Sequence, residues 1–239
     1  MKNYASENAF FRLPFNFDLA LLRKDLTKCM EFEFQGNYIP DNYDGKDYIL
    51  PLRSIDGRLD QPAAIPDNQH RYQSTPALSK CKYFNEVINQ LKCKKEAVRI
   101  MKMPSGAVIN THTDDKCGYE DGVFRLHLPI QTNDDVHFIV NETRLIMEHG
   151  SLWYANFNLP HSVANNGSSD RIHLVIDCIR NDWTDHLFRS LGYDFELEYD
   201  VPEQYSTATK KMMIEQLELQ DTPASRALIE QLKSELDDI

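Results

Sequence analysis

The sequence has 239 residues, of which 41% are hydrophobic and 26% are charged, and its formal net charge is −11. This profile fits one globular domain, or a domain with a small appendage, and it contains no apolar run of about 18 residues that would span a bilayer. Because phosphate contacts dominate nucleic-acid affinity, an acidic chain without a basic stripe is not expected to bind nucleic acid.

The chain begins MKNYASENAFF, which lacks the apolar stretch and the small-residue cleavage site of a secretory signal. Its five cysteines form no C-x-x-C pair and are odd in number. Both features favour reduced thiols and a cytoplasmic protein.

Residues 1–95 are predicted to combine helices with a loop-rich segment. Two stretches, residues 17–29 and 79–93, place their apolar side chains at helical spacing. Between them, the segment from residue 30 to about residue 75 is rich in proline and glycine, and within it residues 47–54 (DYILPLRS) are a candidate strand. We expect this region to pack on the core at the substrate side.

From residue 96 to residue 180 the apolar period changes from helical to two, which predicts short strands separated by turns. The candidate strands are residues 97–103, 122–130, 136–140, 144–148, 152–156 and 171–179. A tight turn at Asn141 and Glu142 would join two of them as a hairpin. So many strands in one short segment predict a sandwich or barrel core.

Helical patterns return in the C-terminal segment, residues 181–239. Residues 184–192 form one candidate helix, and residues 221–236 form a final helix with Pro223 in its first turn. The apolar side of this final helix would either pack on the core or form the contact of a homodimer. The sequence therefore predicts a mainly β protein with flanking helices.

Two of the predicted strands carry arginine and histidine on the face opposite their apolar side chains. Arg125 and His127 share that face in FRLHLPI, and Arg171 and His173 share it in RIHLVID. A solvent-exposed face is one interpretation. The other is a polar lumen for a small anion, because the guanidinium fork binds carboxylates in a bidentate manner.

The stretch INTHTDDKC, residues 109–117, reads as a strand end that carries His112 and Asp114 two residues apart, so both point the same way. Together with His161 they form two imidazoles and a carboxylate, the facial triad that leaves open positions on non-haem Fe(II). Arg171 would then hold the far carboxylate of a dicarboxylate co-substrate. An H-x-D spacing alone arises by chance, so structural roles for these side chains are the alternative.

The stretches PSGAVINTHTD, RLHL, GSLW, PHSVAN and RIHLVID resemble the aspartyl/asparaginyl β-hydroxylase family of Fe(II)/2-oxoglutarate dioxygenases over about 80 residues. The resemblance implies a double-stranded β-helix, a jelly-roll or cupin-like core. It also implies Fe(II) as cofactor, with 2-oxoglutarate and O2 as co-substrates.

By this resemblance His112 and His161 bind the metal. Asp114 completes the triad as in bacterial members such as L-proline cis-4-hydroxylases, whereas the animal enzymes have glycine there. Arg171 matches the arginine that binds the distal carboxylate of 2-oxoglutarate, and His127 matches a histidine that contacts the co-substrate near the metal. Where the animal enzymes have a serine that assists the distal carboxylate, this chain has Met101.

The resemblance implies hydroxylation of an unactivated C–H bond of a free amino acid, with release of succinate and CO2. Arg125, on the substrate side, would pair with the α-carboxylate, and Arg53 would contact the amino group or side chain unless it belongs to a solvated turn. The alternatives are a hydroxylase of a peptidyl or carrier-bound residue, and a non-catalytic barrel that binds a small acid.

Overall fold

The computed structural model describes residues 4–36, 48–65, 71–198, 207–219 and 223–237. The chain divides into two compact units. One unit is Tyr4–Glu198, and the other contains the two C-terminal helices.

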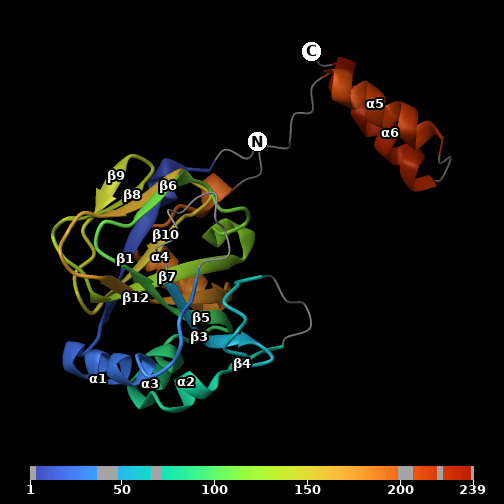
Figure 1. Ribbon diagram of the computed structural model, residues 1–239. Coiled ribbons are helices and arrows are strands. Elements are labelled where there is room, and N and C mark those ends of the chain that lie inside the picture. The colour runs from blue at the N-terminus through green and yellow to red at the C-terminus, as the bar shows by residue number, and fades with distance from the viewer. Residues whose placement is uncertain (1–3, 37–47, 66–70, 199–206, 220–222, 238–239) are drawn as a thin grey trace. The chain divides into compact units, whose positions relative to one another are not determined.

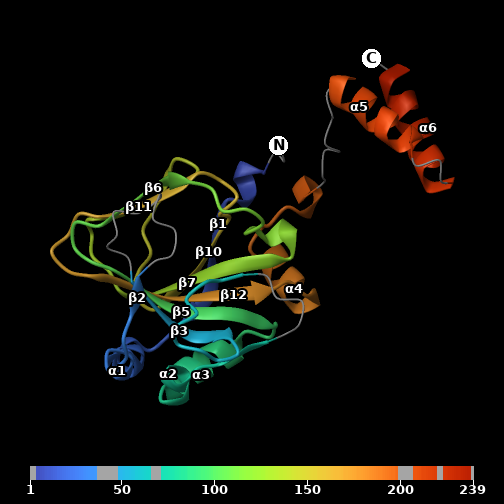
Figure 2. The same ribbon diagram turned by 45° about the vertical axis from the view of Figure 1, so that its right-hand side comes forward.

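Two antiparallel sheets form the first unit, and Figure 2 shows the smaller sheet, with β6 and β11, facing the larger sheet, with β7, β12 and β5. The larger sheet has the order β1-β10-β7-β12-β5-β3-β2, with β4 paired to β3, and the smaller has the order β6-β11-β8-β9. This is the double-stranded β-helix, or jelly roll, that the sequence predicted. The strands of the larger sheet are β1 (Phe10–Asn16), β2 (Gln35–Gly36), β3 (Tyr48–Ile55), β4 (Tyr72–Ser74), β5 (Lys95–Met103), β7 (Val123–Gln131), β10 (Ser151–Ala155) and β12 (Arg171–Ile179). Those of the smaller sheet are β6 (Val108–His112), β8 (Val136–Val140), β9 (Thr143–Leu145) and β11 (His161–Asn165).

The outer face of the larger sheet is covered by helices, as Figure 1 shows for α1 (Leu19–Cys29), α2 (Pro76–Ser79) and α3 (Lys82–Gln90). The apolar positions of β5, β7 and β12 join these helices and α4 (Asp182–Ser190) in one buried cluster. Each fully buried aliphatic side chain contributes about 1.5–3 kcal/mol. Because side chains alternate along a strand, the same alternation turns the polar positions toward the interior between the sheets.

The sequence pattern did not predict a strand at β1, which forms one edge of the larger sheet by pairing with β10. Pro14 lies within it and lacks the N–H that a central strand needs, but an edge strand tolerates proline. The position of β1 at the edge of the sheet therefore explains why a segment that contains a proline still forms a strand.

The hairpin between β8 and β9 is confirmed. Val140 pairs with Thr143, and the two residues between them, Asn141 and Glu142, have φ values of 46° and 65°. Both central residues of a type I′ turn have positive φ, and this turn matches the twist of the paired strands. The second strand ends earlier than predicted, at Leu145.

The second unit contains α5 (Thr207–Glu218) and α6 (Pro223–Asp237). The sequence predicted α6 but not α5. The two helices pack against each other through buried Ile214, Ile229 and Leu232. None of the helices in the described ranges is long and apolar enough to cross a membrane.

Candidate metal centre

Two strands of the smaller sheet bring His112 and His161 together. β6 ends at His112, β11 begins at His161, and these two residues are register partners in the antiparallel pair. Their ring centroids are 4.2 Å apart. The carboxylate of Asp114 joins them from just beyond β6, where the Asp114 N–H donates to the Phe157 carbonyl at 2.8 Å.

One candidate ligand atom from each of the three residues lies within 4.8 Å of the other two. The His112 Nε2 and the Asp114 Oδ1 are 3.7 Å apart. Two imidazole nitrogens and one carboxylate oxygen on a β scaffold fit a non-haem iron site that leaves coordination positions open.

The backbone fixes which nitrogen of each ligand histidine faces the site. The Nδ1 of His112 lies 2.7 Å from the Asn110 carbonyl, and the Nδ1 of His161 lies 3.0 Å from the Leu159 carbonyl. A carbonyl only accepts, so both Nδ1 atoms donate and each Nε2 keeps its lone pair. Burial, with the nearby His112, lowers the pKa of His161 to about 4. His161 is therefore neutral near pH 7, as a metal ligand must be.

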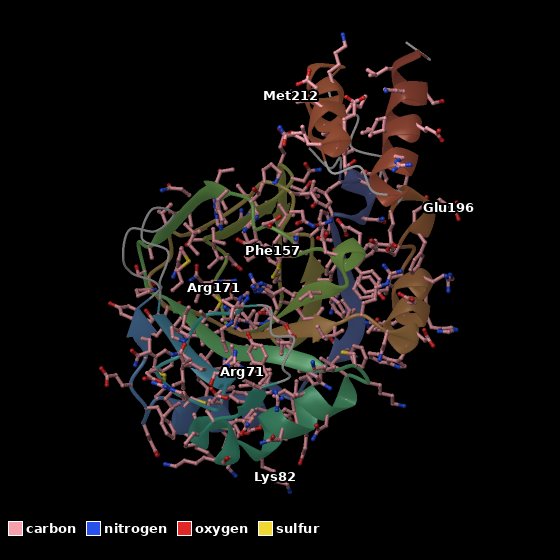
Figure 3. The ribbon with its side chains drawn as sticks, turned by 90° about the vertical axis from the view of Figure 1, so that its right-hand side faces the viewer. Arg71, Lys82, Phe157, Arg171, Glu196 and Met212 are labelled. Atoms are coloured by element: carbon pink, nitrogen blue, oxygen red, sulfur yellow. The ribbon has the colours of Figure 1, made fainter. Side chains whose placement is uncertain are left out.

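Arg171, at the start of β12, is only 2% exposed. Its Nη2 lies 2.9 Å from the Nδ1 of His173, and its guanidinium carbon lies 5.2 Å from the centre of the Phe138 ring. Arginine can only donate, so the Nδ1 of His173 accepts and this imidazole carries its proton on Nε2. Figure 3 shows Arg171 and Phe157 in the interior between the two sheets.

His127 extends this interaction. Its Nδ1 lies 3.4 Å from the Nδ1 of His173, and its Nε2 is buried without a hydrogen-bond partner in the described part of the chain. Burial, followed by the charge of Arg171, lowers the pKa of both His127 and His173 well below 6.5. Both rings are therefore neutral at physiological pH.

Arg125 contacts two carboxylates. Its Nη1 donates to the Asp114 Oδ2 at 2.9 Å, and its Nε donates to the Asp177 Oδ1 at 2.7 Å. Burial opposes the charge of Arg125, but Asp177 and Asp114 raise its pKa well above the usual value. Arg125 therefore remains charged and is held by acidic partners on two sides.

Six of the seven predicted site residues line one cavity, which Arg53 does not line. The six are His112, Asp114, Arg125, His127, His161 and Arg171, and the apolar lining is Met101, Ile109, Phe138, Phe157 and Val163. Arg53 lies near the end of β3, not in a loop, and its Nη2 donates to the Tyr72 carbonyl at 2.9 Å.

Two interior charges were not identified from the sequence. Asp177 continues the polar face of β12 two positions after Val175, and Arg99 lies on β5 with its Nη2 2.9 Å from the Asp177 Oδ2. Continuing the two-residue alternation along these strands would have placed both side chains in the interior.

Comparison with known proteins gives a family match over most of the first unit. The family described as aspartyl/asparaginyl β-hydroxylase matches residues 23–181. An L-proline cis-4-hydroxylase of Rhizobium meliloti (strain 1021) is 29% identical over 163 residues, which is 67% of this chain and 57% of that protein. The chain thus matches less than two thirds of the length of this curated relative.

Solved structures with a similar arrangement include several oxygenases. A 2OG-Fe(II) oxygenase family oxidoreductase from Burkholderia pseudomallei is 12% identical, with a TM-score of 0.48 over 73% of this chain and 86% of that chain. A prolyl-4-hydroxylase from Pseudomonas putida is 14% identical, with a TM-score of 0.47 over 73% and 94% of the respective chains.

Proposed function

Because this chain belongs to the aspartyl/asparaginyl β-hydroxylase family, we propose that it is a 2-oxoglutarate-dependent non-haem iron dioxygenase that hydroxylates an amino acid. The observation that carries the proposal is the convergence of His112, Asp114, His161 and Arg171 on one cavity. Three metal ligands beside a buried guanidinium are the parts that a metal-bound keto-diacid requires.

When bound, Fe(II) with 2-oxoglutarate and O2 supplies the oxidising power for C–H hydroxylation, with succinate and CO2 as co-products. His112, Asp114 and His161 would hold the ion, since all three line the cavity and one ligand atom of each lies within 4.8 Å of the other two. The carbonyls of Asn110 and Leu159 keep both imidazoles turned with Nε2 toward the site.

Arg171 would pair with the distal carboxylate of 2-oxoglutarate. The guanidinium is buried and lies against the Phe138 ring, where water screens its charge poorly. His127 would contact the same co-substrate nearer the metal, as the resemblance implies, and it lines the same cavity as Arg171 and the triad residues. The hydrogen bond that a serine gives in the animal enzymes would come from a group other than Met101, or Arg171 would bind the distal carboxylate alone.

A free amino acid is the proposed substrate. The charges around the cavity support an anionic ligand. Two arginines, Arg125 and Arg171, line it, whereas Asp114 is the single carboxylate among its lining residues. N–H groups of Arg125 that do not contact Asp114 or Asp177 would pair with the α-carboxylate. Arg53 stays a candidate contact to the amino group or side chain of the substrate, although it does not line this cavity.

The test is an anaerobic incubation with Fe(II) and 2-oxoglutarate, followed by O2 and a panel of substrates. Free L-proline is tested first, because the similar protein of Rhizobium meliloti is an L-proline cis-4-hydroxylase. Mass gain of one oxygen atom on a free amino acid, with matching succinate, supports the proposal. Activity on peptides alone would shift it to a peptidyl hydroxylase. Absence of 2-oxoglutarate turnover with any substrate would favour a small-acid-binding barrel.

Two further assignments belong to the proposal. All five cysteines are buried free thiols, which supports a cytoplasmic location. Exposed Met212 and Leu219, at 59% and 80% exposure on and beside α5, support a homodimer through the C-terminal helices.

A further inference from the structure

Four charged side chains of alternating sign run through the interior and end at the candidate metal ligand Asp114. The Arg99 Nη2 donates to the Asp177 Oδ2 at 2.9 Å, and the Arg125 Nε donates to the Asp177 Oδ1 at 2.7 Å. The Arg125 Nη1 then donates to the Asp114 Oδ2 at 2.9 Å. Asp177 therefore contacts Asp114 only through the guanidinium of Arg125.

The guanidinium makes this connection rigid. Its nitrogens lie in one plane, so when Asp177 holds Nε, the direction of Nη1 is also fixed. Nη1 binds one oxygen of Asp114, while the other oxygen, Oδ1, lies 3.7 Å from the His112 Nε2. The two oxygens of Asp114 are thus divided between the arginine and the ligand cluster.

Asp177 can serve as the fixed anchor for Arg125 in this row of ion pairs. It is 4% exposed and lies on β12, between β7 and β5 in the larger sheet, where it is the register partner of Arg125. Asp114, in contrast, lies beyond the end of β6, and its side chain is 28% exposed. A carboxylate on such a segment needs an external partner to keep one orientation.

We propose that Asp177 is a positioning residue of the metal site, which orients Asp114 through Arg125. The inference rests on the proposed function, because it requires that Asp114 binds the metal. The site would bind a divalent ion. Asp177 would hold the Asp114 carboxylate so that one of its oxygens points toward that ion. A further consequence is that Arg125 serves the metal ligand as well as the substrate.

The experiment measures binding of Co²⁺, an air-stable probe, by calorimetry in the intact chain, together with thermal unfolding of each variant. Asp177→Asn keeps the shape but removes the charge that holds Arg125, and we expect Co²⁺ affinity to fall by about tenfold or more. Asp25→Asn is the matched control. Asp25 is also a buried carboxylate, but it lies in α1 and accepts from the Tyr83 and Phe84 N–H groups, outside the cavity. It should lower stability and leave Co²⁺ affinity within about twofold of the wild type.

The route through Asp114 is tested in an Asp114→Gly background. If Asp177 acts through that carboxylate, Asp177→Asn should weaken Co²⁺ binding no further once the carboxylate is gone. An equal loss in both backgrounds, or no loss in either, would overturn the inference. If Asp177→Asn does not fold, Asp177→Glu replaces it in the same comparison, because the longer side chain keeps the charge but moves the carboxylate from its place at the Arg125 Nε.

Different results would contradict the metal site and the positioning role of Asp177. Wild-type protein that binds no divalent ion would remove the metal site itself. Wild-type protein that binds Co²⁺ with the same affinity as Asp177→Asn would retain the site and remove only the positioning role.

Discussion

At the scale of single residues, the interior uses histidine in two ways. His112 and His161 donate from Nδ1 to backbone carbonyls and present Nε2 to the site. His127 and His173 instead contact each other, and His173 accepts from Arg171. The difference follows from position, because the first pair lies at strand ends beside open carbonyls and the second pair lies on paired central strands.

His112→Ala and His161→Ala should each abolish turnover of 2-oxoglutarate while the fold survives, because the proposed metal is catalytic and neither histidine belongs to the hydrophobic clusters. Succinate formation and the thermal unfolding of each variant check this. Near-normal succinate formation by either variant would mean that the ligand is wrongly assigned. Asp114→Gly should weaken iron binding and remove most of the activity.

Arg171→Ala should raise the concentration of 2-oxoglutarate needed for half-maximal rate by at least roughly tenfold, since a charge-assisted hydrogen bond is worth about 1.5–3 kcal/mol. The measurement is succinate formation against 2-oxoglutarate concentration at saturating Fe(II). An unchanged requirement would place the anchor on another cation.

The protein without added metal should lose stability as the pH falls below about 6.5. His127 and His173 are neutral in the folded state because burial lowers their pKa values, but they take up protons once unfolded. Since the unfolded state then binds more protons, each histidine lowers the free energy of unfolding by up to about 1.4 kcal/mol per pH unit. Urea unfolding at pH 7.5, 6.5 and 5.5 measures this. His173→Gln should reduce the slope, and equal stability at all three values would contradict the prediction.

At the scale of elements, β12 is the strand on which the site and the core depend together. Its outward residues Ile172, Leu174 and Ile176 join the cluster beneath the helices. Its inward residues Arg171, His173 and Asp177 are buried in the interior, and Arg171 lines the cavity. Because side chains alternate along a strand, β12 contributes to the candidate site with one face and to the largest hydrophobic cluster with the other. Its position is fixed by pairing with β5 on one edge and β7 on the other.

The turn before β10 gives a prediction at this scale. Gly150 has a φ of 75°, and a Cβ there would lie 2.6 Å from the Phe17 carbonyl oxygen, whereas Gly106, with a φ of 79°, has open space around it. Gly106→Ala should cost about 1–2 kcal/mol for left-handed backbone alone. Gly150→Ala should cost more, because the Phe17 carbonyl next to β1 must also move. Urea unfolding of both variants tests the difference, and equal losses would show that the contact relaxes freely.

Taking the chain as a whole, the proposed site and the two C-terminal helices belong to different units. Every proposed site residue lies within Tyr4–Glu198, and the buried cluster of the C-terminal helices contains residues of α5 and α6 only. The described contacts of the candidate metal site therefore lie among residues of the first unit.

A chain truncated after Glu198 should bind Co²⁺ with the affinity of the full chain, because the described metal-site contacts lie before that residue. Calorimetry on both forms measures this. Analytical ultracentrifugation of the same two samples tests the proposed homodimer, since the truncated form should sediment as a monomer. A dimer that persists after truncation would place the contact in the first unit.

Local sequence patterns were enough to predict the period of the strands and the chemistry of their faces. The alternation in residues 122–130 and 171–179 placed Arg125, His127 and Arg171 opposite the apolar side, and the structure has both strands. Such patterns are local, because neighbouring side chains on one strand obey backbone geometry alone. The same rule put His112 and Asp114 on one side of a strand end.

Which distant residues meet depends on how the strands pair and the sheets pack. The register of β6 with β11 brings His112 to His161, and that of β12 with β7 brings Asp177 to Arg125. The tertiary structure also leaves Arg53 outside the cavity lining and places β1 in the larger sheet despite Pro14. Register and strand order depend on how the sheets pack and close, which involves residues far apart in the chain, so no local pattern specifies them.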